Sequence, residues 1–300
     1  MTIKLHLKLA VLFAFASSIV YAQKEITVTS VKKKMSRGEQ TGFQVSIPEG
    51  KLKDITSAYK KQLETNTKVD VKENGGELVT TGAVNKNFSD KPFTVYSKFL
   101  ETPEGVDMTV FVSEDNENFI SDDSDADKLT ALKKSIRDFA VTEYKEIVNE
   151  KLDVENDKLK DLKKDLENLV EDESDNIKDI SKKQREIENY TTKIETNKTL
   201  QASKTEQVTR QQSTVSEISD KKSPEYKLAT TNLKEYQSER KSLEKDAEKM
   251  GREIDDNKAD INKLEKKNEE LKKQQATAQE KVDAQDKVVK AIEEVLAGIK

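Results

Sequence analysis

The sequence predicts an α+β protein: a small antiparallel-sheet head domain with one packed helix, followed by a long antiparallel α-helical coiled-coil hairpin. Apolar residues recur every seven positions without a break between Tyr226 and Ile299, which is typical of a coiled-coil seam. Seven of the nine Gly lie between Gly38 and Gly105, and no Phe follows Phe139. A compact, turn-rich unit therefore precedes a polar helical region, in a chain that is 37% charged and 5% aromatic.

Residues 1–22 have the pattern of a signal peptide that is cleaved after Ala22. Lys4 and Lys8 supply the positive start, and the apolar run 9–20 follows. This run is shorter than the roughly 20 residues that span a bilayer. We therefore expect an exported protein, periplasmic or secreted, with no transmembrane segment in the mature chain.

Cleavage would remove His6, the only histidine, and the chain contains no Cys and no Trp. Serine and cysteine triads, His-containing metal sites and His acid–base catalysis all need these residue types. We therefore expect no enzyme, and we assign no catalytic, cofactor-binding or metal-binding residues. Only six of the 53 cationic residues are Arg, and the formal net charge is −5, so a nucleic-acid partner is not expected.

Residues 23–120 predict one small α+β domain with its elements in the order β-β-α-β-β-β-β. Alternating apolar residues indicate strands, Asn74-Gly75-Gly76 is a hairpin turn, and Pro48 is expected to open an amphipathic helix. The strands are expected at Ile26–Val28, Phe43–Ile47, Val69–Val71, Leu78–Val84, Phe93–Phe99 and Val106–Val112, and the helix has Leu52, Ile55, Tyr59 and Leu63 on one face.

Two charged clusters resemble binding motifs. Asp123, Asp125 and Asp127 have the spacing that begins a calcium loop, but the Gly and the final Glu of an EF-hand are missing. We expect these acids to cap the next helix instead. The run Lys32-Lys33-Lys34 is interpreted as a solvated, edge-protecting strand face in preference to a site for an acidic glycan or lipid head group.

The helical region is expected to comprise a first arm (residues 121–219), a tip (220–223) and a return arm (224–300). Ser223 is a good N-cap residue, and Pro224 suits the first position of a helix. A stop and restart at this point is favoured over a mere kink in one continuous rod.

The seam of the return arm consists of two seven-residue series. All positions except Arg240, Asn257, Asn268, Gln275 and Gln285 are apolar. The series are Tyr226, Leu233, Arg240, Ala247, Ile254, Ile261, Asn268, Gln275, Val282, Val289 and Leu296, and Ala229, Tyr236, Leu243, Met250, Asn257, Leu264, Leu271, Ala278, Gln285, Ile292 and Ile299.

The apolar pattern of the first arm predicts that its start packs on the head and that a weaker seam follows. Its docking residues are Leu129, Leu132, Ile136, Phe139, Ile147 and Val148. A four-residue phase slip, or stutter, is expected between Leu169 and Ile177. Beyond it only one of the two series remains apolar, from Ile177 and Ile180 through Ile187, Ile194, Val208 and Val215, while the companion series contains Gln184, Thr191, Lys198, Thr205 and Gln212.

A reversal at the tip pairs residues that are equally distant from it. Leu296 and Ile299 then return to the Phe139–Ile147 region, and Asn268 and Gln275 lie opposite residues 168–174. We expect the hairpin to be weakest at these polar positions.

A long charged hairpin in an exported chain without the common catalytic side chains predicts a non-enzymatic structural or interaction protein of the cell envelope. The hairpin would act as a spacer, clamp or scaffold for protein partners in the envelope, with no cofactor. A monomeric hairpin is favoured over a homodimer. The alternative function is a head that binds a small ligand or cell-wall fragment, with the rod serving oligomerisation. A membrane-active toxin would need an apolar hairpin of membrane length, which the mature sequence lacks.

Overall fold

The computed structural model describes residues 25–85, 89–115 and 117–300 and confirms the predicted fold class. The expected signal segment 1–22 and His6 lie outside the described residues. In chain order the elements are β1 (Thr29–Met35), β2 (Gly38–Pro48), α2 (Leu52–Thr67), β3 (Lys72–Asn74), β4 (Glu77–Asn85), β5 (Ser89–Thr102), β6 (Gly105–Ser113), α3 (Ala126–Glu217) and α4 (Pro224–Gly298).

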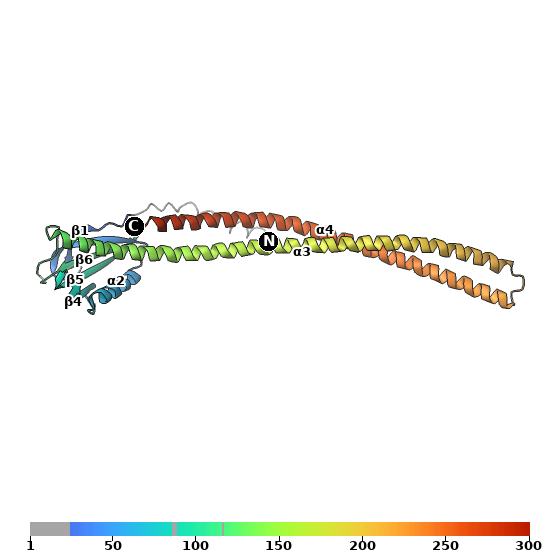
Figure 1. The fold of residues 1–300 in the computed structure, drawn as a ribbon, viewed down its shortest axis with the longest axis horizontal. Helices are drawn as coiled ribbons and strands as arrows, with labels where there is room; N and C mark the ends of the chain where they lie inside the picture. Colours follow the sequence, from blue (N-terminus) through green and yellow to red (C-terminus); the bar gives the residue numbers. More distant parts are fainter. Residues whose placement is uncertain (1–24, 86–88, 116) are drawn as a thin grey trace. The chain divides into compact units, whose positions relative to one another are not determined.

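The chain forms two compact units. The head unit contains the described residues up to Asp161 together with Val282–Lys300, and the hairpin unit contains Leu162–Lys281. Figure 1 shows α3, in green to yellow, turning back into α4, in orange to red. Both helices therefore contribute to both units.

The head unit is built on one antiparallel sheet with the strand order β1-β2-β6-β5-β4-β3. All neighbouring strands pair antiparallel, and the β3–β4 hairpin turns at Gly75 and Gly76. Both glycines have positive φ, which a two-residue turn of this kind requires and which residues with a side chain rarely adopt. The predicted Asn-Gly-Gly turn is confirmed.

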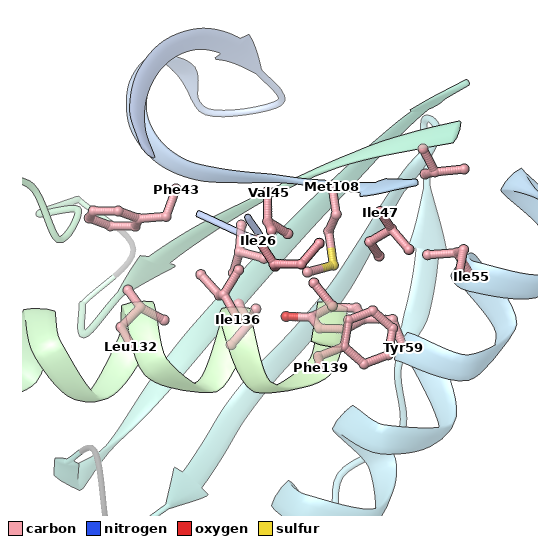
Figure 2. Close-up of a cluster of buried hydrophobic side chains, with 14 of the residues drawn as sticks. Ile26, Phe43, Val45, Ile47, Ile55, Tyr59, Met108, Leu132, Ile136 and Phe139 are labelled. Carbon is pink, nitrogen blue, oxygen red and sulfur yellow. The ribbon is translucent and has the colours of Figure 1, made fainter. Parts of the chain in front are cut away.

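One face of the sheet is covered by α2, by the first turns of α3 and by the end of α4. Figure 2 shows Phe43, Val45, Ile47 and Met108 of the sheet above Leu132, Ile136 and Phe139 of α3, with Ile55 and Tyr59 of α2 beside them. Ile292 of α4 and Ile299, just beyond the end of α4, are buried in the same cluster, and Leu296 packs against it. The predicted return of the C-terminal segment to the head is confirmed.

Three predicted boundaries in the head are wrong. The strand predicted at Val69–Val71 is absent, because the backbone N–H of Val71 donates to Oε1 of Glu64 at 3.3 Å, and β3 begins only at Lys72. Ile26 is buried at 3% exposure but precedes β1, because its carbonyl oxygen accepts a hydrogen bond from Nε of Arg137 at 3.0 Å and has no strand partner. Pro48 ends β2, opposite Gly105, and α2 begins only at Leu52. At Ile26 and Pro48 tertiary contacts override the local pattern.

The loop between β6 and α3 is held by carboxylates. Oδ1 of Asp115 accepts hydrogen bonds from the backbone N–H groups of Asn118 at 2.6 Å and Glu117 at 2.9 Å. These bonds, with the Asn118 side chain, lower the pKa of Asp115 from 3.8 to about 2. The side chain of Lys128 likewise lowers the pKa of Glu114.

This loop predicts acid sensitivity of the head. A folded-state pKa below the unfolded value means that Asp115 stabilises the fold above about pH 4 and that this contribution is lost as the pH falls towards about 2. In thermal unfolding, Asp115→Asn should therefore have a lower Tm than the parent at pH 6, and most of this difference should disappear near pH 2. A difference in Tm that persists unchanged at pH 2 would contradict this linkage.

Candidate functional site: the seam and faces of the hairpin

The tip of the hairpin is formed by a capped restart of the helix. Oγ of Ser223 accepts a hydrogen bond from the backbone N–H of Tyr226 at 3.1 Å, and Pro224 is the first residue of α4. Oδ1 of Asp220 accepts from the backbone N–H of Lys222 at 2.8 Å. Proline needs no intrahelical donor at the first position. The predicted stop and restart is therefore present, and a single kinked rod is excluded.

The seam of α4 follows the two predicted series. Every position of both series is buried or half-buried, including the polar residues Asn257, Asn268 and Gln285, which are below 10% exposed. The seven-residue phase therefore continues unbroken through α4.

The predicted stutter in α3 is wrong. Within the hairpin unit the buried or half-buried positions of α3 continue the heptad phase of Leu162 and Leu169 without a slip. Glu173 and Asn176 occupy the seam where the slip was expected, whereas Ile177 is 51% exposed. The phase is maintained because the facing residues of α4 supply hydrogen-bonding partners for these polar side chains.

The companion series of α3 therefore also differs from the predicted one. Gln184, Thr191, Lys198, Thr205 and Gln212 are exposed. Counting onward from Leu162 and Leu169 in steps of seven residues, whether or not each residue reached is apolar, would have found the true series. It consists of Leu162, Leu169, Asn176, Lys183, Tyr190, Asn197, Lys204 and Gln211.

Polar pairs cross the seam of the hairpin unit at several levels. Nδ2 of Asn176 donates to Oδ1 of Asn268 at 2.8 Å, and both residues are buried. Nε2 of Gln275 donates to Oε2 of Glu173 at 2.9 Å and to the carbonyl oxygen of Leu169 at 3.0 Å. The predicted opposition of Asn268 and Gln275 to the segment near residues 168–174 is thus confirmed to within about two residues.

Ion pairs cross the same seam nearer the tip. Nζ of Lys183 lies 2.9 Å from Oδ2 of Asp260, and Nζ of Lys204 lies 2.5 Å from Oε2 of Glu239. The hydrogen bond raises the pKa of Lys183 and lowers the pKa of Asp260. Because each polar group has a defined partner, a slip of either arm would separate several pairs at once. The pairs thus specify register more than they add stability.

The charged motifs of the head have structural partners. Oδ1 of Asp125 accepts hydrogen bonds from the backbone N–H groups of Asp127 and Lys128 at 3.1 and 3.0 Å, so it caps α3 as predicted. Among the described residues, no group of three or more His, Cys, Asp or Glu side chains could hold a metal ion. Lys32–Lys34 lie on β1, which is an edge strand of the sheet, in agreement with an edge-protecting role.

Two surface depressions differ in their lining residues. One lies in the hairpin unit beside Arg240 and is lined by Thr205, Gln212, Gln237 and Glu244 among others. Another lies at the β5–β6 turn of the head, where Ser46, Thr102 and Asp107 contribute polar groups. The first lacks the mostly apolar lining that small-ligand sites usually have, whereas the lining of the second also includes Ile47, Pro48, Pro103 and Val106.

No family model matches the chain, and no curated protein matches its sequence. In the part of the chain that the structure describes, none of the helices has an apolar stretch of the length needed to cross a bilayer.

Proposed function

We propose that this chain is an exported, non-enzymatic cell-envelope protein that uses its α3–α4 hairpin as a spacer, clamp or scaffold for other proteins. The observation that supports it most is the internal pairing of the seam. The apolar stripe of α4 is covered by α3 of the same chain, and polar pairs such as Asn176–Asn268 hold the two arms in register. Neither arm then requires a second chain to cover its seam.

The proposal assigns the interaction surface to the outer faces of the hairpin. These faces are rich in exposed Lys, Glu and Asp. The part of α3 that belongs to the hairpin unit, from Leu162 to Glu217, is about 84 Å long. A long stiff element with a charged surface suits holding components apart or clamping them. Export would follow from residues 1–22, with a mature chain beginning at Gln23.

Site-specific photo-crosslinking of the full chain in its native envelope tests this function. A photoreactive residue at exposed Lys221 of the tip or at exposed Lys198 of α3 should give a defined protein adduct. The same residue at Leu100 of the head, which is 58% exposed, is the matched control and should give none. Protein adducts from Leu100 alone would place the protein contact on the head and contradict the role proposed for the hairpin, and a mature protein that keeps residues 1–22 or remains in the cytoplasm would overturn the export.

A further inference from the structure

Two exposed apolar side chains share one face of α3 in the hairpin unit. Val170 and Ile177 are seven residues apart and each is 51% exposed, although Leu169 and Ile180 beside them turn into the seam. The exposed residues Ser174 and Ser181 lie on the same face. The resulting stripe, Val170-Ser174-Ile177-Ser181, has spacings of four, three and four, which is the pattern by which one helix packs along another.

We propose that this stripe binds the same stripe of a second copy of the chain, with the two α3 helices antiparallel about a two-fold axis. An axis between Ser174 and Ile177 places Ile177 opposite Ser174 of the second copy and Val170 opposite Ser181 of the second copy. Each large side chain then meets a small one in all four layers, which permits close packing. A two-fold contact of this kind is closed, so it yields a dimer and not a filament.

The charges beside the stripe select the antiparallel direction. Glu171 and Lys178 flank it one heptad apart, and both are exposed. Antiparallel pairing places Glu171 next to Lys178 of the second copy. On the other side of the axis, it places Lys178 next to Glu171 of the second copy. Parallel pairing would place these residues and their copies on opposite sides of the contact, so it would lose this attraction. Within one chain, Nζ of Lys178 already lies 2.8 Å from Oδ1 of Asp175. The Lys178 side chain remains 72% exposed, so it can contact both Asp175 and Glu171 of the second copy.

The size of the stripe predicts weak association. Stable dimers bury about 800 Å² per partner, whereas two apolar side chains per copy contribute only part of such an area. We therefore expect a dissociation constant on the order of 100 µM for the full chain. This dimer is separate from the pairing of α3 with α4, and it does not depend on the proposed function.

Sedimentation equilibrium of the full chain, from micromolar concentration to about 1 mM, measures this association. The parent chain should form dimers, and Ile177→Lys should weaken them by about tenfold or more, because a charge replaces each buried isoleucine. Leu200→Lys is the matched control: Leu200 is 50% exposed on another face of α3 and should not change the association. Circular dichroism should show equal helix content in all variants.

A charge exchange tests the direction of pairing. Glu171→Lys and Lys178→Glu should each weaken the dimer, because each creates two like-charge contacts, and the double variant should restore it. Because the chain has no Cys, Ser174→Cys provides a unique thiol that a short bismaleimide should couple between two copies. Ser203→Cys, at a residue that is also exposed but on another face, should couple poorly.

Three results would overturn the proposal. The first is a parent chain that stays monomeric up to about 1 mM. The second is a dimer that Ile177→Lys and Leu200→Lys weaken equally or not at all, which would place the contact elsewhere. The third is a double charge exchange that fails to restore association, since the antiparallel arrangement requires that it does.

Discussion

Phe139→Ala is expected to lower the free energy of unfolding of the head unit by about 3–5 kcal/mol. Phe139 is 3% exposed, and its ring packs edge-on against Tyr59 with the centroids 4.9 Å apart. It lies in the cluster where the sheet, α2 and α3 meet (Figure 2). Truncation removes the buried ring and leaves a cavity between three elements that are too well connected to collapse into it.

Chemical denaturation of the full chain, followed by NMR signals of the sheet, measures this loss. Val154→Ala provides a control on the same helix: Val154 is 53% exposed, so its truncation should change stability by less than about 0.5 kcal/mol. If Phe139→Ala cost less than about 1 kcal/mol, the start of α3 would not be an integral part of the head core.

The return arm could be predicted closely from the sequence because its periodicity is strong. A two-series repeat sustained from Tyr226 to Ile299 leaves only one face that can be buried, and the structure buries or half-buries that face at every position. The helix start was equally predictable, because Ser223 and Pro224 act through local backbone chemistry. Features that depend only on neighbouring residues can be predicted most directly from the sequence.

The first arm was harder to predict because its seam is defined by its partner. Ile177 has the apolar character of a core residue and Asn176 does not, yet Asn176 is buried and Ile177 is exposed. The residue that reverses this preference is Asn268, 92 positions away along the chain. A single-chain pattern contains no sign of that pairing. The boundary at Ile26 fails for the same reason, since its partner Arg137 belongs to α3.

The exposed apolar residues of α3 are the feature that was least predictable from the sequence. An exposed apolar stripe such as Val170 and Ile177 resembles a phase slip in the seam when the sequence is read alone. Only the three-dimensional phase of α3 separates the two interpretations, because it shows that Leu169 and Ile180 already complete the seam.

Replacing both Asn176 and Asn268 by Leu is expected to stabilise the hairpin unit by about 1–2 kcal/mol, whereas each single replacement should destabilise it by about 1–3 kcal/mol. A single Leu leaves the other amide buried without its partner, and desolvation of that amide then goes uncompensated. Two Leu residues remove both amides and pack as an ordinary apolar layer. The measurement is a double-mutant cycle by chemical denaturation, in which these expected changes imply a coupling of at least about 3 kcal/mol.

Hydrogen exchange of the backbone amides should show where along the chain the hairpin is weakest. Amides from Glu171 to Ile177 should exchange faster in the parent than those beside Ile187 and Ile194, because the layers at Glu173 and Asn176 lack apolar burial. The double Leu variant should slow the exchange of the amides from Glu171 to Ile177. Uniform protection across both segments in the parent would contradict a weak point here.

The cost of this stabilisation should appear as a loss of register specificity. With Leu at both positions, a shift of one arm by a heptad no longer buries an unpaired amide at that layer. The parent chain resists such a shift because Gln275–Glu173 and Lys183–Asp260 would be broken together with Asn176–Asn268. Adding Gln275→Leu and Glu173→Leu to the double variant should therefore yield more than one hairpin register, visible as doubled NMR signals near the tip, while the parent gives one set.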